Sequence, residues 1–147
     1  MGNDRAAALH GLAKDPLLGV RIRPVNAGQA FFAHYEMLPF GDGDGVRFLT
    51  EYGQYTVPVN NTDLFYAYEG LTDDGQHWVS AIFPITLPSL PATADDALGG
   101  QTWEQFSAVY DQYLSGAVAQ LDGQAPGAFA PCLVALDSLV STISVAP

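Results

Sequence analysis

Short apolar segments separated by glycine, proline and aspartate fill the first half of the chain, a pattern typical of β-strands. It predicts extended segments at 20–25, 30–38 and 46–57. The run Gly41–Gly45, in which glycine alternates with aspartate, predicts a turn that joins the last two segments as a hairpin.

The next two segments, 64–69 and 76–85, form the clearest hairpin of the sequence. Leu71–Gly75 between them suits a type I turn closed by a left-handed glycine. If that turn sets the register, Tyr68 lies opposite Ser80 and each face holds alternate residues. One face would hold Leu64, Tyr66, Tyr68, Trp78, Ser80 and Ile82, and the other Phe65, Ala67, Glu69, Val79, Ala81 and Phe83. Neither face is polar, so the sheet is covered on both sides, or covered on one and used for binding on the other.

A helical pattern follows the strands. Thr102 and Gln105 form a capping-box sequence, which predicts a helix start. Apolar residues then recur at spacings of three and four in one stripe: Trp103, Phe106, Tyr110, Tyr113, Leu114, Ala117 and Leu121. We expect one helix over 102–121, packed on the sheet face with Ala67 and Ala81, because small side chains let a helix approach closely.

Two shorter helices complete the prediction. Residues 4–14 read as a helix that ends before Pro16, and Pro131 suits the first turn of a terminal helix. Together these elements predict an α+β fold: an antiparallel sheet of four to five strands, a long helix across one face and a short terminal helix. The length of 147 residues fits a single domain, 1–147.

The charge of the chain is one-sided, with sixteen acidic and five basic residues and a net charge of −11. No Lys or Arg follows Arg47, whereas eleven carboxylates lie from Glu51 to Asp137. This balance argues against a nucleic-acid partner, because phosphate binding requires Lys and Arg. It favours solubility, with recruitment of a cation or a basic partner as the alternative. With 48% hydrophobic residues the chain is too apolar for disorder, and no apolar run is long enough to cross a bilayer.

Candidate metal ligands do not form a site in the sequence. Asp42 and Asp44 invite a calcium interpretation, but no full EF-hand pattern surrounds them, so we interpret them as part of a hairpin turn. Asp73 and Asp74 are interpreted in the same way. No second histidine or cysteine stands at ligand spacing from any of the histidines, which are His10, His34 and His77. We therefore expect neither a metal nor a cofactor.

Candidate catalytic groups are equally sparse. Cys132 begins an apolar helix, which favours a buried and unreactive thiol. His77 and Ser80 would point to opposite faces of one strand, so they make a poor nucleophile and base. Glu51 and Glu69 on neighbouring strands are the one carboxylate pair that suggests a glycosidase. The glycosylation pattern that begins at Asn60 is interpreted as a turn.

Aromatic residues supply the stronger candidate site. Tyr66, Tyr68 and Trp78 share the first hairpin face defined above, and Tyr52 or Tyr55 would extend it. Such side chains combine apolar area with polar tips, which suits a sugar or a partner protein. The alternative is that another part of the protein covers this face.

The segment from Gly45 to Pro91 resembles a block found in uncharacterised secreted or lipid-anchored bacterial proteins, and its flanks agree, with Asn26–Gln29 upstream and Leu136–Ser141 downstream. The resemblance implies that the chain is the C-terminal half of a longer secreted protein, and it implies no activity. The order of sheet, long helix and last helix is also similar to the PsbP/Mog1-like fold, a likeness of pattern only.

These observations favour a non-enzymatic, extracytoplasmic module that binds a protein or a carbohydrate through its aromatic face. The alternative is a carboxylate-based, glycosidase-like hydrolase. The two differ in what the structure should show: an enzyme needs a concave pocket with convergent polar groups, and a module needs a flat or covered aromatic face.

Overall fold

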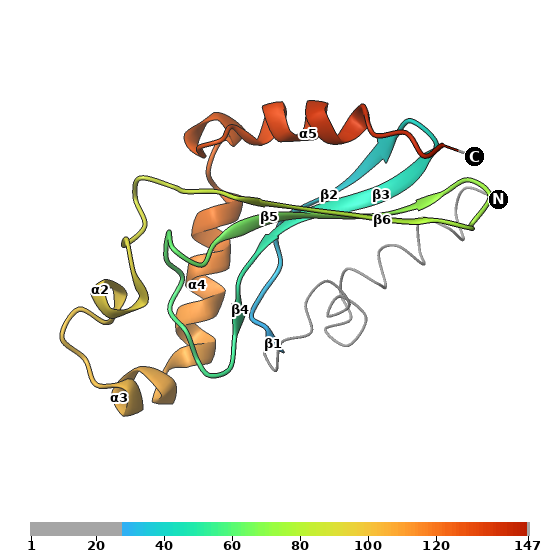
Figure 1. The fold of residues 1–147 in the computed structure, drawn as a ribbon. Helices are drawn as coiled ribbons and strands as arrows, with labels where there is room; N and C mark the ends of the chain where they lie inside the picture. Colours follow the sequence, from blue (N-terminus) through green and yellow to red (C-terminus); the bar gives the residue numbers. More distant parts are fainter. Residues whose placement is uncertain (1–27, 147) are drawn as a thin grey trace.

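The protein has an α+β fold, shown by a computed structural model that describes residues 28–146 (Figure 1). The strands are β1 (Gly28–Gln29), β2 (Ala33–Phe40), β3 (Gly43–Thr50), β4 (Tyr52–Gly53), β5 (Phe65–Thr72) and β6 (Trp78–Pro84). The helices are α2 (Ala94–Leu98), α3 (Trp103–Ala108), α4 (Tyr110–Asp122) and α5 (Leu133–Ser141), with a short 3-10 turn, η2 (Pro126–Ala128), before α5. The predicted α+β class and antiparallel sheet are confirmed. The predicted segments 4–14 and 20–25 lie outside the described residues.

The main sheet has four antiparallel strands in the order β2-β3-β5-β6, and β1 pairs with β4 in a separate two-stranded sheet. A tight turn joins β2 to β3, where Phe40 pairs with Gly43. The strand needs glycine at position 45, because a Cβ there would lie 2.3 Å from the Tyr68 hydroxyl oxygen. We predicted that the whole run Gly41–Gly45 is a turn. Only Gly41 and Asp42 form the turn, because β3 begins at Gly43 and includes Asp44.

The β5–β6 hairpin is confirmed, but its predicted register is wrong by one residue. Tyr68 lies opposite Ala81 and not Ser80. The turn itself closes at the glycine that we predicted: the Gly75 N–H donates to the Thr72 carbonyl, and Gly75 is left-handed, with a φ of 71°. The Thr72 N–H then donates to the His77 carbonyl, so the connection is longer by one residue. A shift of one residue moves every side chain of β6 to the other face.

Both faces of the sheet carry buried apolar residues. The first face holds Leu49, Tyr66, Tyr68 and Ala81, and α5 lies along it through Leu133, Leu136 and Val140 (Figure 1). The opposite face holds a smaller buried cluster of Val46, Phe48 and Ala67. Ala67 and Ala81 therefore do not share a face, so the surface on which we expected the long helix to pack does not exist.

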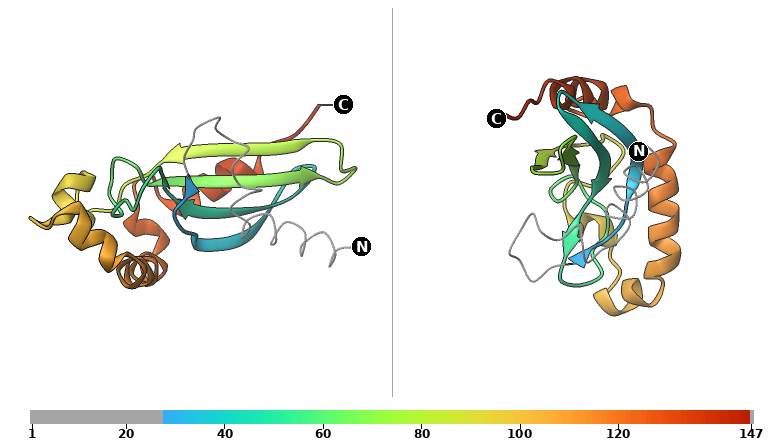
Figure 2. Two further views of the ribbon diagram at one scale, coloured as in Figure 1. Left: turned by 90° about the horizontal axis from the view of Figure 1, so that it is seen from below. Right: turned by 90° about the vertical axis from the view of Figure 1, so that its right-hand side faces the viewer.

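The predicted helix over 102–121 is two helices. The capping box predicted at its start is present, with the Thr102 side chain accepting from the Gln105 N–H. At Val109 the backbone leaves the helical region, with φ −117° and ψ 14°, and α4 starts anew at Tyr110. The predicted packing of one long helix across the sheet is not confirmed: α4 contacts β2 and passes one end of the sheet (Figure 2).

A short helix that we did not predict, α2, precedes these two. Thr93 and Asp96 form a second capping box, and Gly99 ends the helix in the left-handed region at φ 58°. This helix and the segment before it stand beside α4 (Figure 1). Among residues 28–146, no helix combines the length and the apolarity that crossing a membrane requires.

Candidate functional site

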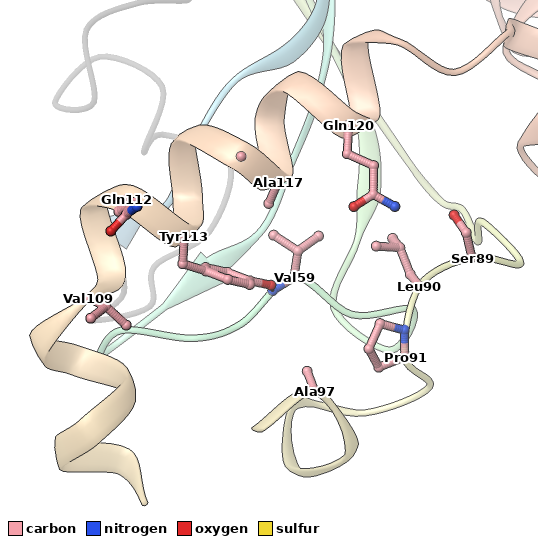
Figure 3. Close-up of a pocket in the computed structure, with 11 residues that line it drawn as sticks. Val59, Ser89, Leu90, Pro91, Ala97, Val109, Gln112, Tyr113, Ala117 and Gln120 are labelled. Atoms are coloured by element: carbon pink, nitrogen blue, oxygen red, sulfur yellow. The ribbon is translucent and has the colours of Figure 1, made fainter. Parts of the chain in front are cut away.

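A groove of about 590 Å³ opens between α4 and the chain that runs into α2 (Figure 3). This volume is in the range of small-molecule sites. The α4 groove, as we call it, is lined from α4 and its start by Val109, Gln112, Tyr113, Gly116, Ala117 and Gln120, and from other segments by Val59, Ser89, Leu90, Pro91 and Ala97.

The side chain of Asn61 fixes the wall formed by Ser89, Leu90 and Pro91. Its amide nitrogen donates to the carbonyls of Leu87 at 3.0 Å and Leu90 at 3.1 Å, and its amide oxygen accepts from the Leu87 N–H at 2.8 Å. The Asn61 N–H also donates to the Pro91 carbonyl at 2.9 Å. Four hydrogen bonds of this one residue therefore hold the wall in place.

The α4 wall is built of small residues at its centre. Gly116 stands in the middle of the helix, where glycine is less stable than alanine by about 1 kcal/mol. A Cβ at Gly116 would meet no atom within 4 Å, so no neighbouring group requires glycine there. Gly116 and Ala117 both line the groove, so the α4 wall carries no large side chain at these two positions.

The floor of the groove connects to a buried carboxyl. The Tyr113 hydroxyl accepts a hydrogen bond from the Val59 N–H at 2.9 Å, which joins α4 to the segment after β4. Behind it, Glu51 is buried, and its Oε1 accepts from the Asn60 N–H at 2.8 Å, whereas Oε2 is buried without a hydrogen-bond partner among the described residues. Burial raises the pKa of Glu51 to about 8, against the lowering effect of the Asn60 N–H and with a smaller increase from Asp63. Glu51 is therefore mostly neutral at pH 7.

The groove itself is apolar with a neutral polar edge. Val59, Leu90 and Ala117 supply its apolar surface, and Gln112, Gln120 and Ser89 bring amide and hydroxyl groups (Figure 3). Among the described residues that line it, none is Asp, Glu, His, Lys, Arg or Cys. Such a site offers shape, apolar contact and neutral hydrogen bonds, and it offers no charged group for acid–base or nucleophilic chemistry.

Known proteins give no further guide to this site. No family model, curated protein or solved structure matches the chain. The expected resemblance to secreted or lipid-anchored bacterial proteins stays a prediction, and the assignment of the site depends on its geometry.

The residues predicted to bind a ligand do not share one surface. Tyr66 and Tyr68 are 0% exposed beneath α5, and their hydroxyls donate to Asp137 at 2.9 Å and to the Leu38 carbonyl at 2.7 Å. Trp78 is 45% exposed on the opposite sheet face, and Tyr52 stacks on Phe65 with centroids 5.5 Å apart. The single aromatic face that we predicted is therefore not formed, whereas binding by Trp78 or Tyr52 stays a prediction.

Glu69 on β5 is buried, and the register of β5 against β6 places two hydrogen-bond donors beside its carboxylate. Its Oε2 accepts from the Trp78 indole N–H at 2.5 Å, and its Oε1 accepts from the Ser80 hydroxyl at 3.2 Å. Burial raises the pKa of Glu69 to about 7, although both hydrogen bonds lower it.

Glu69 and Glu51 lie at different positions along the sheet. Glu69 pairs with Val46 in the middle of β3, whereas Glu51 follows the end of that strand at Thr50. The two positions therefore differ by five residue steps, about 17 Å along an extended chain. Glycosidase carboxyls stand about 5 to 9.5 Å apart.

Arg47 is buried at 3% exposure and bound to two carboxylates. It pairs with Glu36 at 2.6 Å and with Asp137 at 3.2 Å, and it also donates to the His34 carbonyl. Because Arg47 is the one Lys or Arg in the sequence from residue 28 to 146, the described surface presents no such side chain in an exposed position.

The acidic turns do not assemble a metal site. Asp42 lies in the β2–β3 turn and accepts from the Val145 N–H at 2.6 Å, whereas Asp44 is in β3. Asp74 accepts from the Thr72 hydroxyl and the Gln76 N–H, in agreement with a turn role. Within residues 28–146, no three His, Cys, Asp or Glu side chains are grouped so that they could hold a metal ion.

The residues that shape the groove were not found from the sequence. Asn61 was interpreted as part of a turn, which is its backbone conformation, but its side-chain contacts join segments 26 and 29 residues apart. Gly116 did carry a signal, because a glycine inside a strong helical pattern often has a packing or functional reason.

Proposed function

We propose that the protein is a non-enzymatic binding module whose α4 groove takes a small, uncharged, amphipathic molecule. The observation that carries this proposal is the pairing of an apolar, ligand-sized groove with a neutral polar edge around Gly116. An apolar body would lie on Val59, Leu90 and Ala117, and a head group with hydroxyls or amides would reach Gln112 or Gln120.

The charge of the chain supports an uncharged ligand. An anion would meet a surface rich in carboxylates, and no Lys or Arg of residues 28–146 stands in the groove to bind it. A cation would find no carboxylate among the described lining residues. The chemistry that the groove offers a ligand is therefore apolar contact with neutral hydrogen bonds.

The proposal is tested with Nile red, a neutral dye that fluoresces in apolar sites, and with octyl glucoside below its micelle concentration as the competitor. The decisive variant is Gly116→Leu, which should place a side chain in the groove and weaken dye binding at least about tenfold. Gly116→Ala is the matched control, because it adds only a methyl group at the same open position.

The proposal fails if Gly116→Leu and Gly116→Ala bind Nile red equally well while both melt as folded proteins. It also fails if octyl glucoside does not displace the dye. The anionic dye ANS should bind much more weakly than Nile red, since the acidic surface repels it.

A carboxylate-based hydrolase has less support. Its best acids, Glu51 and Glu69, have raised pKa values of about 8 and about 7, but Glu69 lies within β5, Glu51 follows the end of β3, and neither lines the α4 groove. An extracytoplasmic location stays part of the proposal, and it depends on the resemblance alone.

A further inference from the structure

A second groove, separate from the α4 groove, lies between α3 and the segment that follows β4. It has a volume of about 470 Å³ and is lined by Tyr55, Thr56, Val57, Trp103, Glu104 and Ser107. None of these residues lines the α4 groove. The Thr56 and Ser107 hydroxyls are 2.6 Å apart and hydrogen-bonded, so the two walls of this aromatic groove are held together.

Two large aromatic side chains at this groove are left open to solvent. Tyr55 is 83% exposed and Trp103 is 45% exposed. Single exposed aromatic residues are common and need no explanation. Two that line the same apolar groove, with a carboxylate beside them, indicate a binding site. The buried ring of Phe106 packs edge-to-face against Trp103, with ring centroids 6.4 Å apart.

The charges around the aromatic groove favour a cation. Glu104 is one of its lining residues, and Arg47, the one Lys or Arg in this part of the chain, is buried in its ion pairs. Residues 28–146 therefore present carboxylates without exposed Lys or Arg to compete for the groove. A field of one sign raises the local concentration of oppositely charged ligands.

We propose that the aromatic groove binds a compact quaternary ammonium ion, of which choline is the simplest example. The faces of tryptophan and tyrosine attract such cations, and the methyl groups of the ion match the apolar lining. Glu104 supplies the opposite charge. The ammonium ion keeps its charge at every pH, so the interaction needs no proton transfer.

The same charges select among quaternary ammonium compounds. Phosphocholine and glycine betaine carry an anionic group next to the ammonium, and no Lys or Arg of residues 28–146 is exposed to bind it. We expect free choline to bind about tenfold more tightly than either compound. A phosphocholine lipid head group is therefore excluded by the proposal, and preference for it would overturn the proposal.

The test is isothermal titration calorimetry of the full chain with choline and with its neutral tert-butyl isostere, which has the same shape without the charge. We expect saturable choline binding, with the isostere weaker by about tenfold. Trp103→Ala and Tyr55→Ala should each remove most of the binding, and Glu104→Gln should weaken it several-fold. Leu139→Ala is the matched control, because Leu139 is also an exposed large side chain, at 52%, but lies on α5 outside this groove.

Each other outcome counts against the proposal. Equal affinity for choline and the isostere would show an apolar site without cation recognition. Saturable binding of glucose or cellobiose in place of choline would assign the groove to sugars. Choline binding that survives Trp103→Ala and Tyr55→Ala, in proteins with unchanged melting curves, would place the cation elsewhere.

Discussion

The buried carboxyl of Glu51 is the residue whose chemistry departs furthest from its ordinary state. Its pKa of about 8 exceeds the ordinary value of about 4.5, so the folded protein holds this proton more tightly than the unfolded chain does. Between these two values the unfolded chain has lost the proton and the folded protein has kept it. The free energy of unfolding therefore falls as the pH rises from about 4.5 to about 8.

Glu51→Gln should remove this part of the pH dependence, because glutamine cannot titrate and keeps an oxygen for the Asn60 N–H. Thermal melts from pH 5 to pH 8 should show a smaller loss of stability in the variant than in the natural protein. The variant should gain most at the alkaline end. Parallel pH profiles for the two proteins would show that Glu51 is not buried as described.

Two glycines should respond in opposite ways to the same substitution. Gly116→Ala should raise the free energy of unfolding by about 0.5 to 1 kcal/mol, since a Cβ there meets no atom and helix propensity improves. Gly45→Ala should be strongly destabilising, because its Cβ would lie 2.3 Å from the Tyr68 hydroxyl oxygen and 2.5 Å from the Glu69 carbonyl oxygen. Denaturant unfolding of the two variants measures both effects, and a loss of stability in Gly116→Ala would show that α4 packs more closely than described.

At the scale of the elements, the packing at the junction of α3 and α4 depends on the ring of Phe106. Phe106 is 3% exposed and packs against the rings of Tyr110 at 5.6 Å and Tyr113 at 4.9 Å. Phe106→Ala should cost about 3 to 5 kcal/mol. Trp103→Ala, one turn earlier and 45% exposed, should cost much less and serves as the comparison. Equal melting temperatures for the two variants would contradict this packing.

The elements that local rules govern could be predicted from the sequence, and those that distant contacts govern could not. The Thr102–Gln105 capping box and Pro131 marked the starts of α3 and of the last helix correctly within a few residues. The break at Val109 was missed because the apolar stripe continues through it. The register of β6 was missed because it depends on where pairing resumes after the turn, and Gln76 and His77 gave no signal for the additional residue.

The candidate site could not be predicted from the sequence either, because contacts between distant segments form it. Tyr66 and Tyr68 looked available for binding because the sequence does not show which helix covers which face, and α5 covers theirs. Asn61 acts through residues 26 and 29 positions away, and the α4 groove exists only once α2 and α4 stand side by side. The sequence pointed to Tyr66, Tyr68, Trp78 and Tyr52, whereas the exposed aromatic residues that share a groove are Tyr55 and Trp103.

At the scale of the whole molecule, the described part carries fourteen of the sixteen carboxylates and one buried arginine. These carboxylates repel one another more in the folded protein than in the expanded chain, and salt screens them over about 10 Å at about 0.1 M. Added sodium chloride should therefore raise the melting temperature. Calcium at matched ionic strength should add little, since Asp42 and Asp44 stand on different elements. A large calcium-specific rise reversed by a chelator would contradict this assignment.

The central claim, that the α4 groove is a ligand site, is tested most directly by backbone amide chemical shifts during a titration with octyl glucoside below its micelle concentration. We expect saturable shifts that concentrate at Gly116, Ala117 and Gln120 on α4 and at Ser89 and Leu90 on the facing wall, with none at Trp78 on β6. Gly116→Leu should abolish them. Shifts scattered over the surface, or shifts that persist unchanged in Gly116→Leu, would contradict the claim.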